Sequence, residues 1–495
     1  MSFRCLIDTN VFFQLEEPAP SGLSIRAEFA ELSRLCLKHG VRIFIHPISK
    51  KDFADDPNET RKKNTTLLFD KYPVLESPPY GLTPDLEALF GGIGKSNDLI
   101  DSQIVYAVYR NAVNYLISED GGVHTRARRA GLNGRVFSVK EFCNHLRQLF
   151  EPDIRTSLPS VEDLPIYSLN RADSVFESIR KEYSGFDAWF EKICLEGRRS
   201  WVVRTQEKIS AVCIYKGEGS KDAPSKLGNK VLKLCTFKVA DAHRGGKLGE
   251  LLLKSAFLYA SENNIDSIYL TTFVRDEYFM LFLKDFGFKI HPEQTPLGEL
   301  IFYKTASRLQ KPDPTLDPLK FHILYSPEFR DDSEISKYVI PIRPAFHELL
   351  FPEVSQEKQM TLLHTTSSIP GNTIKKVYLC HSPIKVLDPG GLMLFYRSED
   401  IKAVTSVGIV EGSHRVSDLN QAISLVGKRS VYSLDQIEKM LSKETLIIEF
   451  RLIKHLKTVI PFKELMQRGT LKAPPQAILK VENSRYKPIV KIVHS

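Results

Sequence analysis

Five aspartates stand where their carboxylates could act together. Asp8 and Asp120 each end a short apolar run, Asp52 follows another, and Asp98 and Asp101 lie three residues apart. Carboxylates that converge on one point repel each other unless a cation lies between them, and oxygen ligands with few histidines suit Mg²⁺ or Mn²⁺. Such a cation can activate water against a phosphodiester. The aspartates therefore predict a metal-dependent hydrolase site.

The elements around these aspartates are expected to bring them to one edge of a sheet. Apolar strands and periodic helices alternate along the first 150 residues, with strands ending near 8, 49 and 118 and helices at 24–40 and 96–110. This alternation favours a parallel α/β sheet. In such sheets the loops at the carboxyl ends of the strands line the site.

Residues 1–150 resemble the PIN-domain ribonucleases. Asp8, in Asp-Thr-Asn, matches the first acid of that family, and Asp120, in Ser-Glu-Asp, matches its fourth. Asp101 is preferred as the third acid because one helix, a turn and a strand fit between it and Asp120, with Asp98 as its rival or as an additional ligand. The resemblance implies a metal site at Asp8, Asp101 and Asp120, and RNA as substrate.

The second acid of this site stays open. Asp52 is the first choice, with Asp55 and Asp56 as alternatives. Asn10 and Ser118 could orient the ligand carboxylates by hydrogen bonds. The competing interpretation is that Asp8 caps a helix and that the other acids are surface charges.

A second chemical feature is the loop HRGGKLG at 243–249, which follows an apolar strand at 230–239 and precedes a periodic helix at 250–260. Unpaired backbone N–H groups and the helix dipole make such a helix start an anion site. Glycines allow the backbone to approach a phosphate closely. The strand, loop and helix therefore predict a phosphate-binding turn.

This turn resembles the loop of the GNAT acyltransferases that holds the pyrophosphate of acetyl-CoA. Arg244 and Gly249 match the first and last positions of the loop motif, Lys247 replaces its middle glycine, and Gly287-Phe288 matches the family's later Gly-Phe pair. The resemblance implies an α+β sheet at about 165–306. It also implies these acetyl-CoA contacts: Val239, Arg244, Gly245, Gly246, Lys247, Leu248 and Gly249.

The catalytic side of this resemblance is incomplete. Many GNAT enzymes have a tyrosine four residues before the Gly of Gly-Phe, as general acid for the leaving thiolate. That position is Leu283 here, and Tyr278, one turn upstream, is either a substitute or a packing aromatic. The sequence therefore predicts acyl-CoA binding more directly than acyl transfer.

The last part of the chain, 320–495, is rich in short apolar segments separated by turn residues. They read as strands at 321–325, 375–381, 391–397, 403–411, 444–453 and 477–481. This pattern predicts a small β-barrel with added helices. The segments at 384–398 and 404–412 resemble PUA-like domains of the ASCH/EVE type, which implies binding of RNA or modified bases, although the turn at 389–391 lacks the family's aspartate.

Several basic residues could contact an RNA backbone. The chain has a net charge of +8, and residues 320–495 hold 25 Lys and Arg against 18 Asp and Glu. Clustered cations of this kind supply phosphate contacts, although a solvated surface explains them equally well. The candidates are Arg126, Arg128, Arg129, Arg397, Lys428 and Arg429.

Length and composition complete the expectation. The 495 residues suggest three domains, at 1–150, 165–306 and 320–495, with linkers at 151–165 and 306–320. The seven cysteines form no CxxC pair, and no apolar run has the length of a membrane helix. We therefore expect a multidomain α/β plus β protein of the cytoplasm, without a membrane partner.

The first functional hypothesis is a PIN-type ribonuclease that uses Mg²⁺ or Mn²⁺. A GNAT-like domain would bind acetyl-CoA and a PUA-like domain would position tRNA or mRNA. A toxin-like or defence role, with an antitoxin or a second copy as partner, is an expectation from architecture. The alternatives are an N-acetyltransferase acting on RNA, aminoacyl-tRNA or protein amines, and a non-enzymatic regulator that senses acetyl-CoA.

Overall fold

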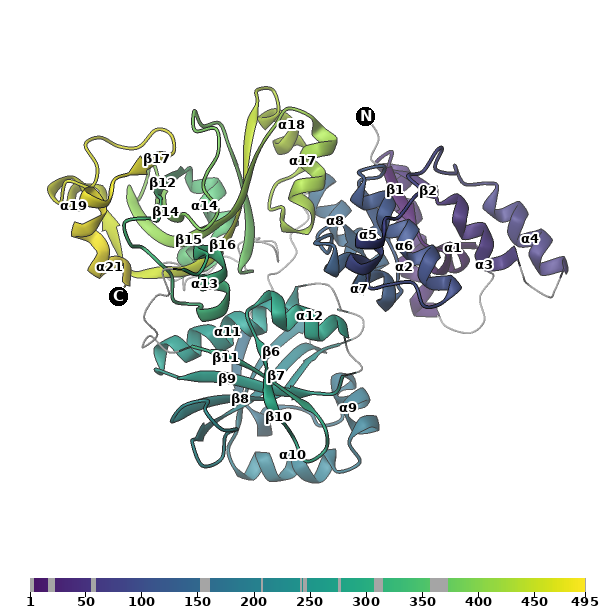
Figure 1. The fold of residues 1–495 in the computed structure, drawn as a ribbon, viewed down its shortest axis with the longest axis horizontal. Helices are drawn as coiled ribbons and strands as arrows, with labels where there is room; N and C mark the ends of the chain where they lie inside the picture. The colour runs from purple at the N-terminus through teal and green to yellow at the C-terminus, as the bar shows by residue number, and fades with distance from the viewer. Residues whose placement is uncertain are drawn as a thin grey trace.

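The computed structural model contains three β-sheets, each in its own unit (Figure 1). We call these the N-terminal unit (4–151), the middle unit (161–306) and the C-terminal unit (315–494). Within them the structure describes residues 4–16, 23–54, 59–151, 161–205, 208–240, 243, 247–274, 277–306, 315–356 and 373–494. The candidate site residues Asp55, Asp56, Arg244, Gly245 and Gly246 lie outside these ranges.

The N-terminal unit is the parallel α/β sheet that the alternation predicts. Its strands are ordered β2-β1-β3-β4, and every pairing between them is parallel. Its elements are β1 (Arg4–Ile7), α1 (Thr9–Glu16), α2 (Leu23–Lys38), β2 (Arg42–Ile45), α3 (Lys51–Ala54), α4 (Glu59–Phe69), α5 (Pro84–Phe90), α6 (Ser96–Tyr109), β3 (Tyr115–Ile117), α7 (Gly121–Arg129), β4 (Val136–Phe137) and α8 (Val139–Phe150). The helices cover a sheet whose central strands β1 and β3 are almost wholly buried.

The middle unit is a seven-stranded sheet ordered β10-β11-β9-β8-β7-β6-β5. Its elements are β5 (Val161–Pro165), α9 (Glu177–Glu182), α10 (Phe186–Leu195), β6 (Arg199–Thr205), β7 (Lys208–Gly219), β8 (Lys230–Val239), α11 (Leu248–Glu262), β9 (Ser267–Thr272), α12 (Glu277–Asp285), β10 (Lys289–Gln294) and β11 (Leu300–Thr305). The β8–β9 pair is parallel and its neighbours are antiparallel. Residues 161–165 were expected to belong to a linker, but they form the edge strand β5. This strand pairs with β6 along its whole length.

The C-terminal unit is a six-stranded mixed sheet ordered β13-β16-β15-β14-β12-β17. Its elements are α13 (Pro318–Tyr325), β12 (Lys337–Ile342), α14 (Pro344–Leu350), α15 (Pro352–Gln356), β13 (Lys375–Cys380), β14 (Leu392–Arg397), β15 (Ala403–Val416), α17 (Leu419–Val426), α18 (Leu434–Met440), β16 (Thr445–Pro461), α19 (Phe462–Gln467), β17 (Leu479–Val481), α20 (Asn483–Tyr486) and α21 (Val490–His494). β13 and β17 form its edges, so the closed barrel stays a prediction.

One predicted strand in this unit is wrong. Residues 321–325 belong to the helix α13, because Asp317 caps its first turn and Pro318 occupies its first position. Proline is favoured there, since its fixed φ suits a helix and its missing N–H would have no partner in the helix. The apolar run alone could not distinguish a buried helix from a strand.

The three units are in contact with one another. Tyr115 of β3 donates a hydrogen bond to the carbonyl of Ile423 in α17 (3.3 Å), and the two units share one hydrophobic core. The middle unit reaches the N-terminal unit where α12 packs on α7, and it reaches the C-terminal unit through an ion pair between Lys254 and Glu353. In the described part of the chain, no helix is both long and apolar enough to span a membrane.

Candidate functional site

The first candidate site is an acidic cluster at the carboxyl ends of β1 and β3. Asp8 directly follows β1 and is buried. Its Oδ1 accepts a hydrogen bond from the backbone N–H of Thr9 at 2.7 Å. Its Oδ2 accepts hydrogen bonds from Ser118 Oγ at 2.5 Å and from Asn10 Nδ2 at 2.8 Å. The predicted orienting hydrogen bonds from Asn10 and Ser118 are therefore present.

Asp120 and Asp101 approach each other around Gly122. Asp120 caps α7, and its Oδ1 accepts the backbone N–H of Gly122 at 2.6 Å. A Cβ atom at Gly122 would lie 2.9 Å from Asp120 Oδ1 and 3.6 Å from Asp101 Oδ2. Glycine at 122 therefore leaves the space between two carboxylates open. Asp52 joins the cluster through a hydrogen bond that its carboxylate accepts from the Thr9 hydroxyl.

Asp98 has a different environment from Asp101, although both lie on α6. Its Oδ2 accepts the backbone N–H groups of Gly94 at 2.9 Å and Lys95 at 2.8 Å, and its Oδ1 pairs with the Arg126 guanidinium. These N–H groups, followed by Arg126, lower the pKa of Asp98. Asp98 thus acts as a helix cap with a charge partner, whereas Asp101 faces the cluster.

The cluster carries a surplus of negative charge. Burial, reinforced by neighbouring carboxylates, raises the pKa of Asp8 to about 6 and that of Asp101 to about 7. Burial also raises the pKa of Asp52. One cation is close, since Arg126 Nε lies 3.8 Å from Asp101 Oδ2. Charged oxygens that lack counter-charge are the donor set that a hard divalent cation prefers.

The carboxylates are not already arranged as a cage. Among the described residues, no group of three or more His, Cys, Asp or Glu side chains is positioned to hold a metal ion. The chemistry of the donors fits Mg²⁺ or Mn²⁺. The metal site at Asp8, Asp101 and Asp120, with Asp52, stays a prediction.

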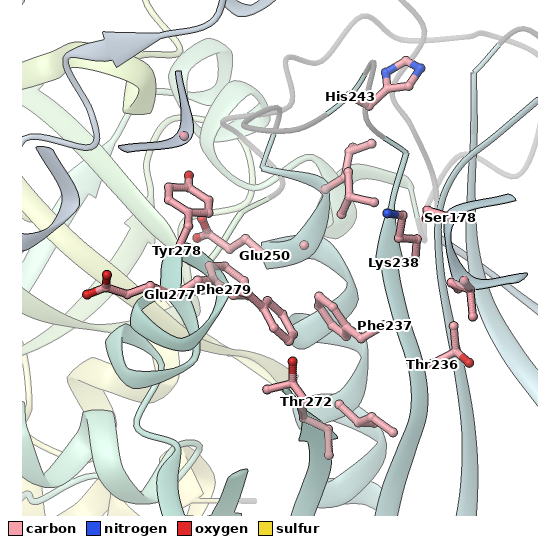
Figure 2. Close-up of a pocket in the computed structure, with 18 of the residues that line it drawn as sticks. Ser178, Thr236, Phe237, Lys238, His243, Glu250, Thr272, Glu277, Tyr278 and Phe279 are labelled. Carbon is pink, nitrogen blue, oxygen red and sulfur yellow. The ribbon is translucent and has the colours of Figure 1, made fainter. Parts of the chain in front are cut away.

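The second candidate site is a gap between two parallel strands of the middle unit. β8 and β9 pair only from Val231 to Leu234, and a register shift at Cys235 turns β8 away. The remainder of β8 continues beside β7 to Val239, so its other edge faces a cavity of about 1500 Å³. Figure 2 shows Phe237 and Lys238 on this strand, with Thr272 of β9 and Phe279 of α12 around the same space.

All three units contribute to the walls of this cavity. The middle unit supplies β8, β9, α12 and the first turn of α11. From the N-terminal unit come Gly121, Gly122 and His124, and from the C-terminal unit come Lys375, Lys428 and Arg429. Gly121 and Gly122 follow Asp120 directly, so the acidic cluster and the cavity share the start of α7.

The described residues of the predicted acyl-CoA loop, His243 and Lys247 to Gly249, line this cavity. Lys247 precedes α11 with a φ of 60°, a left-handed conformation that glycine adopts more readily than lysine. Its Nζ is buried with no hydrogen-bond partner in the described part of the chain, and burial lowers the pKa of Lys247 to about 8. Val239, Leu248 and Gly249 also line the cavity. A Cβ atom at Gly249 would lie 3.3 Å from Phe282, so glycine lets the helix start lie close to α12.

The two positions considered for a general acid, Leu283 and Tyr278, lie in different environments. Leu283 is 0% exposed and packs in the core of the middle unit. Its aliphatic side chain has no proton to donate. Tyr278 lines the cavity, but its hydroxyl accepts a hydrogen bond from Arg128 of α7 at 3.0 Å. The Arg128 guanidinium also lies 4.4 Å from the centre of the tyrosine ring. Arg128 therefore holds Tyr278 against the N-terminal unit.

Sequence reasoning missed a carboxylate on the β9 side of the cavity. Glu299 precedes β11 and is almost buried, and its Oε1 accepts a hydrogen bond from the Tyr183 hydroxyl at 2.8 Å. Leu300 pairs with Thr272, so Glu299 lies beside Phe273 at the open end of the gap. Only the pairing of β11 with β9, which no motif encodes, could have indicated its place.

The cations predicted to contact RNA already have carboxylate partners. These partners are Asp98 for Arg126, Asp285 for Arg128, Glu277 for Arg129, Asp400 and Glu348 for Arg397, Glu141 for Lys428, and Glu411 and Glu449 for Arg429. Three of these pairs join different units. The cations therefore have a structural role in this conformation, and their contact with RNA stays a prediction.

The C-terminal unit contains a Ser-His-Glu hydrogen-bond network with the residue types of a hydrolase triad. His455 lies 2.7 Å from Glu353 through Nε2 and 2.9 Å from Ser406 through Nδ1. Ser406 is 0% exposed, so no substrate can reach its hydroxyl. This network therefore holds β15, β16 and α15 together. An ion pair between Lys254 of α11 and Glu353 connects it to the middle unit.

Comparison with known proteins gives low similarities. No family model matches the sequence, and no curated protein matches it significantly. Among solved structures, the ASCH protein of Zymomonas mobilis has 18% identity and a TM-score of 0.24, covering 32% of this chain and 94% of that chain. The PaiA N-acetyltransferase of Thermoplasma acidophilum, in complex with coenzyme A, has 17% identity and a TM-score of 0.24, covering 30% and 99%. A GNAT-family acetyltransferase of Staphylococcus aureus Mu50 has 20% identity and a TM-score of 0.23, covering 30% and 99%.

Proposed function

We propose that the protein binds acyl-CoA in the cavity of the middle unit and transfers the acyl group to an amine. The observation that carries this proposal is the separation of β8 from β9 after Leu234. The edge of β8 that faces the cavity presents backbone groups that can pair with an extended ligand containing amides, as an added strand does. The N-terminus of α11, at the end of the same gap, suits the phosphates of that ligand.

The residues present fit this ligand at both ends of the gap. The Nζ of Lys247, which is buried with no hydrogen-bond partner among the described residues, supplies a positive charge beside the helix start. Phe237, Phe279 and Phe282 supply an apolar wall between the ends of the cavity. A hollow of about 1500 Å³ is larger than the usual range for small-molecule sites, which leaves room for an acceptor as well.

The acceptor side offers a base. Bound acyl-CoA would supply a thioester carbonyl that an amine can attack. Glu299, held by Tyr183, would bind the incoming ammonium and accept its proton. Tyr278, at the start of α12, lies on the wall of the same cavity, where its hydroxyl could donate a proton to the leaving group.

Transfer of a labelled acetyl group tests this function. The full chain is incubated with [¹⁴C]acetyl-CoA and, in parallel, with a polyamine, a lysine-rich peptide, aminoacyl-tRNA and bulk RNA. We expect label on at least one amine acceptor with the wild type and loss of that label with Glu299→Gln. If acetyl-CoA binds and no acceptor is labelled, the protein is a sensor of acyl-CoA and not a transferase.

A second candidate function has its own observation. Four carboxylates, Asp8, Asp52, Asp101 and Asp120, gather at the carboxyl ends of β1 and β3, and burial together with mutual repulsion raises the pKa of Asp8 and of Asp101. We propose that this cluster binds a divalent cation and hydrolyses RNA phosphodiesters. Asp8 and Asp101 would be direct ligands, Asp120 and Asp52 would complete the oxygen set, and the cation would supply an activated water.

Cleavage of labelled tRNA and mRNA tests this second function. We expect Mn²⁺-dependent cleavage that EDTA and Asp8→Asn abolish. Asp70→Asn serves as the control, since Asp70 is exposed and forms an ion pair with Lys50. Cleavage that persists in Asp8→Asn would assign the activity to a contaminant and reject the acidic cluster as its source.

A further inference from the structure

Two lysines at the junction of the middle and C-terminal units form no ion pair with the residues that the structure describes. Lys247 Nζ, before α11, is buried without a hydrogen bond to any described residue. Lys375 is the first residue of β13, and its side chain forms no ion pair with any described carboxylate. Its Nζ lies 5.6 Å from the centre of the Phe286 ring. Both lysines line the cavity.

The other cations at this junction have their charges matched. Lys428 pairs with Glu141 at 2.8 Å. Arg429 pairs with both Glu411 at 2.9 Å and Glu449 at 3.0 Å. Among these four cations, Lys247 and Lys375 are therefore the two without an ion pair to a described residue.

One carboxylate, Glu250 in the first turn of α11, ties the two lysines together. Glu250 is almost buried, and its Oε1 accepts the backbone N–H of Lys375 at 2.7 Å. This hydrogen bond places the start of β13 against the start of α11. Its charge also raises the pKa of Lys247, although burial has the larger effect and lowers that pKa to about 8.

We propose that Lys247 and Lys375 together bind one phosphate group of a nucleotide cofactor, so that the C-terminal unit completes the anion site of the middle unit. Two ammonium groups and the N-terminus of a fifteen-residue helix match the charge of a phosphate dianion. The cofactor would then contact both units. This inference rests on the proposed acyl-CoA site and adds a residue from another unit to it.

The burial of the two lysine side chains also favours a bound anion. Desolvation lowers the pKa of Lys375 to about 8, as it does for Lys247, and Arg451 and Arg429 contribute to the effect. The buried Lys247 ammonium is repelled by Lys375, and Glu250 is the neighbouring carboxylate that offsets part of this charge. Excess positive charge of this kind is unfavourable in a protein interior. A bound phosphate would remove that repulsion, which gives the ligand a reason to hold the two units together.

The test uses the full chain and calorimetric titration with CoA, dephospho-CoA and inorganic diphosphate. We expect Lys375→Met and Lys247→Met each to weaken CoA binding about 10- to 100-fold. Lys375→Arg should keep most of the affinity, because it keeps the charge. Lys233→Met is the matched control, since Lys233 lines the same cavity near the other end of β8 and lies over the Tyr269 ring.

Dephospho-CoA identifies which phosphate is bound. If the two lysines bind the diphosphate, Lys375→Met weakens dephospho-CoA as much as CoA. If they bind the 3′-phosphate, only CoA responds. Melting temperatures of each variant establish that the chain is folded before binding is compared.

The outcomes separate this inference from the proposed function. CoA binding that Lys375→Met leaves unchanged would overturn the inference and leave the acyl-CoA site intact. Diphosphate binding that depends on Lys375, with CoA no tighter than diphosphate, would support the anion site and overturn the acyl-CoA proposal. Binding of neither ligand to the wild type would reject both.

Discussion

Arg128 of the N-terminal unit forms an ion pair with Asp285 of the middle unit, with 2.5 Å between Nη1 and Oδ2. Arg128 lies in the last turn of α7, the helix whose N-cap is Asp120, and Asp285 ends α12, which lines the cavity. This nine-residue helix therefore begins at the acidic cluster and lines the cavity of the middle unit from Gly121 to Arg128. The ion pair makes α7 the physical connection between the two candidate sites.

Removal of Arg128 should destabilise the protein. Its side chain is 8% exposed and also donates to Tyr278, so Arg128→Met leaves Asp285 without its counter-charge. We expect a loss of roughly 3 kcal/mol in unfolding free energy, as for other buried ion pairs that lose one partner. Chemical denaturation measures it. Arg34→Met, which breaks an exposed pair with Glu31, is the control and should cost less than about 1 kcal/mol. Equal effects in the two variants would show that the Arg128 pair stabilises the fold no more than an exposed pair does.

Glu299→Gln should reduce acyl transfer without reducing cofactor binding. The amide cannot accept the proton of the attacking amine, so kcat should fall about 100-fold or more. The dissociation constant for acetyl-CoA should stay unchanged, because Glu299 lies on the acceptor side of the gap. Initial rates and calorimetry measure the two quantities. Glu293→Gln, on the exposed strand β10, is the control. A variant that loses acetyl-CoA affinity while keeping kcat would remove Glu299 from the proton transfer.

Divalent cations should stabilise the protein only at neutral or higher pH. The folded-state pKa of Asp8 is raised to about 6 and that of Asp101 to about 7. The folded protein therefore holds protons there that the unfolded chain has lost, and this contribution to stability disappears as the pH rises from about 4 to 7. A cation can replace those protons. We expect Mn²⁺ to raise the melting temperature at pH 8 and to have little effect at pH 5.

Two variants of α6 control this cation test. Asp101→Asn should remove most of the Mn²⁺-dependent shift, because Asp101 faces the cluster. Asp98→Asn should keep that shift, since Asp98 is occupied by Arg126 and the N–H groups of residues 94 and 95. Identical Mn²⁺ shifts at pH 5 and pH 8, or a full shift in Asp101→Asn, would argue against a metal site in the cluster.

Lys247→Met should stabilise the ligand-free protein. Burial lowers the pKa of Lys247 to about 8 from an ordinary value near 10.5. The charged lysine therefore costs stability below pH 8, and the cost disappears as the pH rises from 8 to 10.5. We expect Lys247→Met to gain on the order of 1 to 3 kcal/mol at pH 7 and nothing near pH 10.5. Thermal melts across this range measure the gain. A variant that is less stable than the wild type at pH 7 would mean that Lys247 is not strained by its burial.

The sequence predicted the helices and strands around both candidate sites, whereas the sites themselves stay predictions. The strand-ending Asp8 and Asp120 and the helix start after Lys247 each have a local signature. The choice between Asp98 and Asp101 was harder, because both fit one helix face. Only the fold shows that a turn of backbone N–H groups occupies Asp98 and leaves Asp101 for the cluster.

Contacts between units could not be predicted from the sequence. Arg128, Arg129 and Lys428 look like phosphate-binding residues in a basic run, but each pairs with a carboxylate far along the chain. Lys375 had no motif at all, and its place depends on how β13 meets α11. Such pairings follow from the packing of whole units, which periodicity and spacing do not record.

Calorimetric titration of the full chain with acetyl-CoA tests the central claim most directly. The separation of β8 from β9, the cavity and the helix start of α11 predict saturable binding of one acetyl-CoA per chain, weakened at least about tenfold by Lys247→Met. No heat of binding at ligand concentrations up to the millimolar range, from a chain that melts cooperatively, would contradict the account.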